Sequence, residues 1–211
     1  MQFPESKITD EVFTLQKDSY ITSIIYWITD YRNQKISRKL PEFLKEMDLS
    51  EIDNIIDEIP NSSDYDKQVI HCLRWVKQNI TYKSDQEVWK VPEMWQTVEE
   101  TLGLASGDCE DGALLLYWLC RQKGVPSNRL LIFAGDVEGG GHCWLGYRSA
   151  KYPINLIPLD WCYWYNGNDI PDRVFHNIDG QKIIEFNTIY NRYYKIWFCF
   201  DEDNSYRRIR W

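Results

Sequence analysis

The spacing of apolar residues changes from a helical to a strand-like period part-way along the chain. Between Ser50 and Pro60, isoleucines recur three and four residues apart, which predicts a short helix that begins at the serine and ends before the proline. A second stripe at the same spacing comprises Val69, Leu73, Val76 and Ile80. With weaker patterns in residues 11–31 and 40–48, these stripes predict a helical N-terminal half.

A further helix is predicted to begin at Asp108. This aspartate is a favourable N-cap, and Asp111 stands at the third helical position, where its carboxylate can accept from the amide of the cap residue. The apolar run ALLLYWLC follows, and Gly124 is a natural helix end. This assignment places Cys109 in the first turn of the helix.

After residue 128 the apolar segments read as β-strands separated by Gly, Pro, Asn and Asp. The predicted strands are RLLIFAGD, HCWLGYRS, INLIPLDWCYWY, KIIEF and YYKIWFCF. Helices followed by strands indicate an α+β fold in which helices pack on an antiparallel sheet. We interpret residues 1–60 as a helical N-terminal extension or subdomain, and residues 61–211 as the main domain.

The net charge and the N- and C-terminal segments limit which binding partners and which cellular location we expect. The formal net charge is −8 and the one basic run is YRRIRW at the C-terminus, so we expect no nucleic-acid partner. MQFPESKITDEVF lacks the basic and apolar regions of a secretory signal, and ITSIIYWI is too short to span a bilayer. We therefore expect a cytoplasmic protein without a membrane segment, whose six cysteines are reduced thiols.

Three residue types that thiol chemistry needs occur in order along the chain. Cys109 lies at a helix start, His142 early in one predicted strand and Asp160 late in another. A nucleophilic thiol needs an imidazole to take its proton and a carboxylate to hold that imidazole in the right tautomer. Helix-start amides also favour a thiolate and an oxyanion. A set of Cys, His and Asp can instead bind zinc, so that alternative stays open.

The segments that carry these residues resemble a known superfamily. SGDCEDGALLLYWLCRQKGVP, GGGHCWLGYR and INLIPLDW resemble the transglutaminase-like superfamily of papain-like thiol enzymes over about residues 68–165. The tract MWQTVEETLGLASGDCED is similar to the bacterial transglutaminase-like cysteine peptidases. The resemblance implies a Cys-bearing helix packed on an antiparallel sheet, with Cys109 as nucleophile, His142 as general base and acid, and Asp160 as its orienting partner.

The resemblance also bears on the acids beside the cysteine. In some periplasmic members of the peptidase family, such acids take part in calcium binding that activity requires, and the matching positions are Asp108 and Glu110. The resemblance implies that the triad itself requires no cofactor and makes calcium a candidate ion at these acids. Gly112 departs from the family pattern, which often has an aromatic residue there.

Three further side chains are candidates for an oxyanion hole or for substrate contacts. Gln96 and Trp95 lie upstream of the nucleophile and carry suitable N–H groups, and Trp144 lies on the strand face that carries the histidine. The alternative is that the tryptophans fill the core and Gln96 lies on the surface. Cys143 and Cys162 are expected to point away from the triad as buried packing thiols.

The leading interpretation is a thiol hydrolase that cleaves an amide bond in a peptide or protein through a thioester intermediate. Two alternatives stay open. The same triad can transfer the acyl group of a protein glutamine to an amine, as in a transglutaminase. The fold can also serve as a binding module without turnover.

Overall fold

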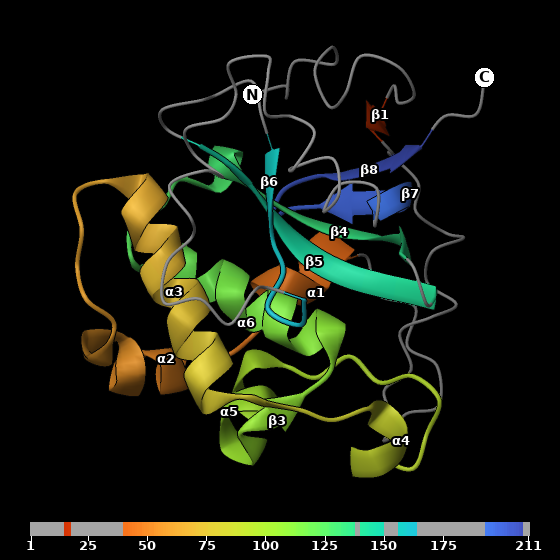
Figure 1. Cartoon of the computed structure of the whole chain (residues 1–211), viewed down its shortest axis with the longest axis horizontal. Coiled ribbons are helices and arrows are strands. Elements are labelled where there is room, and N and C mark those ends of the chain that lie inside the picture. The colour runs from red at the N-terminus through yellow and green to blue at the C-terminus, as the bar shows by residue number, and fades with distance from the viewer. Residues whose placement is uncertain (1–14, 18–39, 138–139, 150–155, 164–192, 209–211) are drawn as a thin grey trace.

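Figure 1 shows the computed structural model, in which residues 15–17, 40–137, 140–149, 156–163 and 193–208 are described. Helices gather on one side of an antiparallel sheet, so the predicted α+β arrangement is confirmed. The α-helices are α1 (Leu40–Lys45), α2 (Ser50–Ile55), α3 (Tyr65–Asn79), α4 (Asp85–Val88), α5 (Val98–Leu104) and α6 (Cys109–Gln122). Two short 3-10 helices are η2 (Ile56–Glu58) and η3 (Ser127–Arg129).

The main sheet has six strands in the order β1-β8-β7-β4-β5-β6, and every neighbouring pair is antiparallel. Its strands are β1 (Leu15–Lys17), β4 (Leu130–Val137), β5 (Gly140–Arg148), β6 (Leu156–Leu159), β7 (Tyr193–Phe200) and β8 (Ser205–Arg208). A separate parallel pair joins β2 (Thr81–Tyr82) to β3 (Ser106–Gly107). The chain therefore inserts β7 between β4 and β8, which consecutive hairpins alone would not produce.

The N-terminal prediction needs one correction. Leu15–Lys17 form a strand that pairs with β8, where the apolar pattern predicted a helix. Tertiary pairing overrides the local preference there, because β8 offers a free edge. The rest of the 11–31 prediction and the predicted strand KIIEF lie outside the described residues.

Helix α6 is the centre of the apolar core. Leu114, Leu115 and Leu116 are consecutive and all fully buried, so the helix is covered on all sides and not only along one stripe. It packs between α3 and the strands β4 and β5. Leu40 of α1 and Ile52 of α2 join the same apolar core, while the predicted division at residue 60 stays a prediction.

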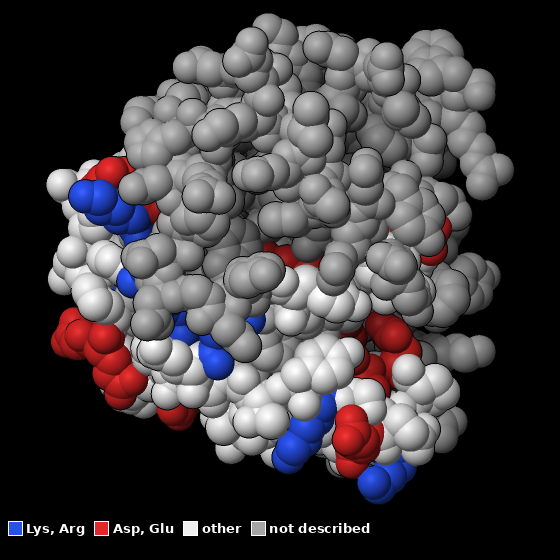
Figure 2. All heavy atoms as spheres, in the orientation of Figure 1, with Lys and Arg blue, Asp and Glu red and all other residues white. Residues whose placement is uncertain are grey.

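The described surface carries mixed charges. Figure 2 shows acidic and basic side chains interspersed over this face, without a continuous basic patch among the described residues. Among the same residues, no helix combines the length and apolar character that crossing a bilayer requires.

The first turn of α6 lies in close contact with Trp161, in the turn that follows β6. A Cβ built on Gly112 would stand 2.2 Å from the indole, so only glycine lets the ring approach this closely. Trp161 is 4% exposed, and its indole N–H donates to the carbonyl of Cys109 at 3.2 Å. The departure from the family pattern at Gly112 thus has a local reason: the space is filled by an aromatic ring from another segment.

We predict that Gly112→Ala destabilises the protein by about 1–3 kcal/mol, because the added methyl forces Trp161 away from α6. The measurement is urea unfolding followed by tryptophan fluorescence. Gly103→Ala is the matched control, since it adds the same methyl within α5 and meets nothing within 4 Å. Equal stability of the two variants would contradict the packing argument.

Candidate active site

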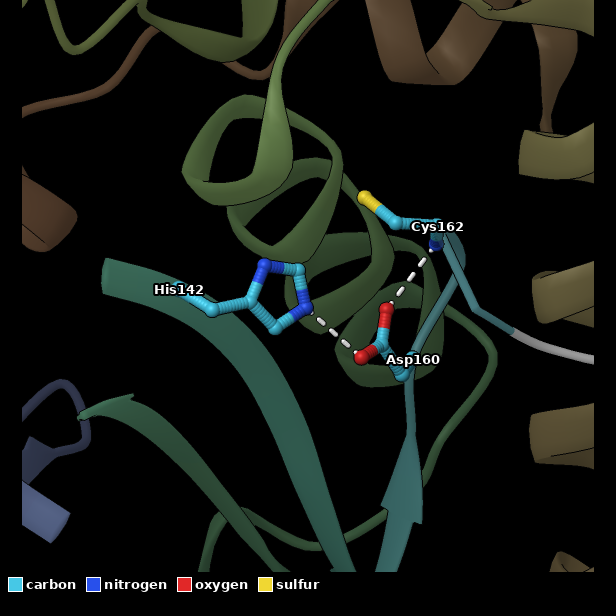
Figure 3. A group of neighbouring side chains, drawn as sticks. All are labelled: His142, Asp160 and Cys162. Carbon is cyan, nitrogen blue, oxygen red and sulfur yellow. Dashed lines mark hydrogen bonds and ion pairs between the residues drawn. The ribbon is translucent and has the colours of Figure 1, made fainter. Parts of the chain in front are cut away.

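A buried hydrogen bond joins His142 to Asp160. Nε2 of His142, on β5, lies 2.7 Å from Oδ2 of Asp160, which directly follows β6 (Figure 3). The two residues are 6% and 1% exposed. The second oxygen of Asp160 accepts from the backbone amides of Cys162 and Tyr163, which fixes the carboxylate in the turn.

This bond determines which nitrogen of His142 is available for chemistry. With Nε2 directed at Asp160, Nδ1 is the nitrogen on the other side of the ring (Figure 3). The ring lies between Trp144 and Tyr163, with centroid distances of 6.1 Å and 4.8 Å. The pair therefore has the geometry of an oriented imidazole that can exchange a proton through Nδ1.

Cys109 begins α6, where the sequence places it. Its carbonyl receives the indole N–H of Trp161, so the residue after Asp160 ties this helix start to the His142–Asp160 pair. Its thiol donates to Oε2 of Glu110 at 3.1 Å and is not bonded to His142. Burial, and then the neighbouring Asp108 carboxylate, raise the pKa of the Cys109 thiol well above its ordinary value.

Five acids converge beside Cys109; we refer to them as the acidic cluster. They are Asp85, Glu93, Asp108, Glu110 and Asp111. In two triads, Asp85–Glu93–Glu110 and Asp85–Asp108–Asp111, one carboxylate oxygen of each acid lies within 4.8 Å of the others. The parallel pair β2–β3 explains why acids from distant segments lie close together. Beside this pair, the Lys83 amide donates to the Gly107 carbonyl at 3.0 Å. That bond brings the start of α4 next to the start of α6. No pattern in the sequence indicated that Asp85 or Glu93 belongs to this site.

Asp111 has a structural role within the acidic cluster. One of its oxygens accepts from the Gln96 amide at 2.8 Å, and the other accepts from the Asp108 amide at 3.0 Å and from the Gln96 side chain at 2.7 Å. The predicted contact between Asp111 and the cap residue is therefore present. These bonds use both oxygens of Asp111 and fix the segment upstream of α5 against the start of α6.

Three other oxygens of the acidic cluster are buried without any hydrogen bond. They are Oδ1 of Asp85, Oδ1 of Asp108 and Oε1 of Glu110. Burial raises the pKa of Asp85 to about 7 and that of Glu110 well above its ordinary value, with the charge of Asp108 adding to both. A carboxylate oxygen buried without a partner is costly, so this arrangement favours either bound protons or a bound cation. Oxygen-only donors fit a hard cation such as calcium.

The remaining predicted residues lie near the site but have other partners. Gln96 is buried, not on the surface, and its side-chain amide donates to Asp111. The indole N–H of Trp95 donates to Glu93 at 2.9 Å. Trp144 stacks on Phe133 as well as flanking the histidine. Their roles in an oxyanion hole or in substrate contacts stay predictions.

One expectation about the thiols is wrong. Cys143 is buried in β5 as expected, but Cys162 does not continue a strand. β6 ends at Leu159, and Asp160 holds the following residues in a turn through its bonds to their amides. The turn places the Cys162 side chain beside His142 and Asp160 (Figure 3).

The comparisons with known proteins identify the family of this chain. Residues 49–152 match the family described as bacterial transglutaminase-like cysteine proteinase, a range that includes Cys109 and His142. The chain is a transglutaminase-like cysteine peptidase. Among curated proteins, none matches this peptidase.

Solved structures of LapG from Legionella pneumophila are among those similar to this chain. The EGTA-treated form aligns with a TM-score of 0.52 and 17% identity over 79% of this chain and 82% of that one. Another LapG structure gives a TM-score of 0.49 and 15% identity, covering 79% and 84% of the two chains. The calcium-bound form gives 0.44 and 21%, covering 57% and 69%. The first alignment confirms the transglutaminase-like fold of this peptidase.

We predict that Asp85→Asn stabilises the peptidase by roughly 1–3 kcal/mol at pH 7.5 when divalent cations are chelated. The folded pKa of Asp85 lies above that of an exposed aspartate, so the unfolded chain loses this proton first. The raised pKa of Asp85 therefore contributes stability that is fully present below about pH 4. This contribution is lost as pH rises through about 7, where the folded carboxyl group ionises.

The measurement is urea unfolding in chelator at several pH values. The gain from Asp85→Asn is expected to shrink toward zero at acidic pH. The control is Asp53→Asn, which changes an exposed acid on α2. A gain independent of pH would assign the effect to shape and not to charge.

Proposed function

We propose that this peptidase hydrolyses amide bonds with Cys109 as nucleophile, His142 as general base and acid, and Asp160 as the carboxylate that orients the imidazole. The observation that carries the proposal is the buried 2.7 Å bond between His142 and Asp160. It leaves Nδ1 to exchange a proton with a thiol at the start of α6. The Trp161–Cys109 bond supports it, because it fixes that helix start beside the turn of Asp160.

Each proposed step uses a group in this arrangement. The Cys109 side chain turns from Glu110 toward His142, and Nδ1 takes the thiol proton as the sulfur attacks the scissile carbonyl. Amides of the first turn of α6 stabilise the oxyanion. His142 then gives its proton to the leaving amine, and a water activated by the same nitrogen releases the acyl group from the thioester. Asp160 keeps the ring in one tautomer throughout.

Iodoacetamide tests the triad without a known substrate. We expect Cys109 to be alkylated at neutral pH faster than the other five thiols, because His142 takes its proton. His142→Ala should slow alkylation of Cys109 by roughly tenfold or more, and Asp160→Asn by a smaller factor. Mass spectrometry of timed samples in saturating calcium gives the rate at each cysteine.

The control variant is His71→Asn, which changes a histidine of α3 that contacts the Pro60 carbonyl. Equal reactivity of all six thiols would reject the nucleophile assignment. A labelled primary amine added with a casein substrate separates the two acyl-transfer outcomes. Cleavage without amine incorporation supports the hydrolase, and incorporation without cleavage supports a transglutaminase.

We further propose that Asp85, Asp108 and Glu110 hold a calcium ion beside the nucleophile. The support is local: each contributes a buried oxygen without a hydrogen bond, and all the donors are carboxylates. A bound calcium ion would offset the negative charge that now disfavours a thiolate at Cys109. Glu110, which the helix-capping argument leaves unexplained, would then turn from the thiol of Cys109 toward the ion.

Glu110→Gln and Asp108→Asn are expected to weaken calcium binding by roughly tenfold or more, since each removes a charged ligand. Isothermal titration of the chelator-treated protein with calcium chloride measures the affinity. Glu99→Gln serves as the control, because Glu99 is an exposed acid of the nearby α5. Calcium binding that is equally tight in the unmodified protein and in all three variants would exclude this site.

A further inference from the structure

Cys162 adds a third metal-binding group to the His142–Asp160 pair. A ring nitrogen of His142, a carboxylate oxygen of Asp160 and the sulfur of Cys162 all lie within 4.8 Å of one another. Figure 3 shows the sulfur on the side of the turn that faces the imidazole. Asp160 itself creates this arrangement, because its bonds to the amides of Cys162 and Tyr163 bend the chain back after β6.

The donor set differs in kind from the acidic cluster. Imidazole nitrogen, thiolate sulfur and carboxylate oxygen are the ligands that zinc takes, at about 2.0–2.3 Å each in a tetrahedral site. Tetrahedral ligands at those lengths stand roughly 3.3–3.7 Å apart, so ligation would open the 2.7 Å contact between His142 and Asp160 by side-chain rotation. Hard cations avoid sulfur and nitrogen donors, so calcium and zinc would select different groups of residues here.

Two of the three ligands are already ordered. His142 and Asp160 are at least nine-tenths buried and bonded to each other, and Asp160 is fixed by two further amides. Cys162 is partly exposed. Ordered donors lower the entropic cost of binding an ion.

We propose that His142, Asp160 and Cys162 form an inhibitory site for a divalent cation of the zinc class. Binding releases the Cys162 thiol proton to solvent and engages the imidazole as a ligand. Because His142 is the base of the proposed mechanism, an occupied site stops turnover. The inhibitory effect therefore rests on the proposed function, whereas metal binding by these three residues does not.

Cobalt absorption tests binding without any need for catalysis. Full-length Cys109→Ala protein, in saturating calcium, is titrated with cobalt chloride as the probe. The expected result is a thiolate-to-cobalt charge-transfer band that is lost in Cys109→Ala/Cys162→Ser. Cys109→Ala/Cys143→Ala is the matched control and should keep the band, because it removes the thiol next to His142 and leaves Cys162. A band that survives removal of Cys162 would overturn the site.

Zinc inhibition then tests the consequence. The concentration of zinc chloride that halves casein cleavage is expected to rise roughly tenfold or more in Cys162→Ser, with each protein normalised to its own rate without zinc. An unchanged concentration would mean that zinc acts elsewhere, such as at Cys109, and would refute the proposal. A protein without peptidase activity that still shows the Cys162-dependent cobalt band would refute the proposed function and support the metal site.

Discussion

The contact between Trp161 and the first turn of α6 holds the candidate site together. The indole lies directly against Gly112 and donates to the carbonyl of Cys109, so a helix start and a strand end that are far apart in the chain become neighbours. Asp160 precedes this tryptophan and bonds to His142, which places the imidazole at the same junction. A ring that large can approach a helix so closely only where the helix carries glycine. The geometry of the thiol and the histidine therefore depends on a packing contact as much as on polar bonds.

Buried negative charge is the second constraint, and it works against the thiol. Asp85, Asp108 and Glu110 surround the start of α6 with carboxylates, each of which has one buried oxygen without a hydrogen bond, and burial raises the pKa of each. The helix dipole and the first-turn amides favour a thiolate at Cys109, whereas burial and the Asp108 charge raise the pKa of its thiol. A peptidase with this arrangement gains reactivity from anything that neutralises the acidic cluster, which connects the calcium proposal to the chemistry of the nucleophile.

The two proposed cation sites differ in the donor atoms that they offer to a metal ion. In one site the donors are carboxylate oxygens alone, and in the other they are a nitrogen, an oxygen and a sulfur. Hard and borderline cations separate on this basis more than on size or charge. One ion would relieve the charge that disfavours the thiolate, and the other would engage the imidazole that takes its proton. Two different groups of residues would then have opposite effects on activity, one through a hard cation and the other through a cation of the zinc class.

The sequence by itself determined the local parts of this peptidase. The stripe that ends at Ile80 predicted α3, and Asp108 with Asp111 predicted the start of α6 and the place of Cys109. His142 and Asp160 were found from strand patterns and from the order of residue types. These features depend on residues only a few positions apart, because helix and strand periods and capping bonds are local.

Only the tertiary structure decided which distant segments meet. Asp85 joined the acidic cluster because β2 pairs with β3, Gln96 was buried by its bonds to Asp111, and Leu15–Lys17 became a strand because β8 was beside them. Cys162 faces the histidine because Asp160 ends the strand and turns the chain. Such contacts depend on packing between segments far apart in sequence, which a local period does not encode.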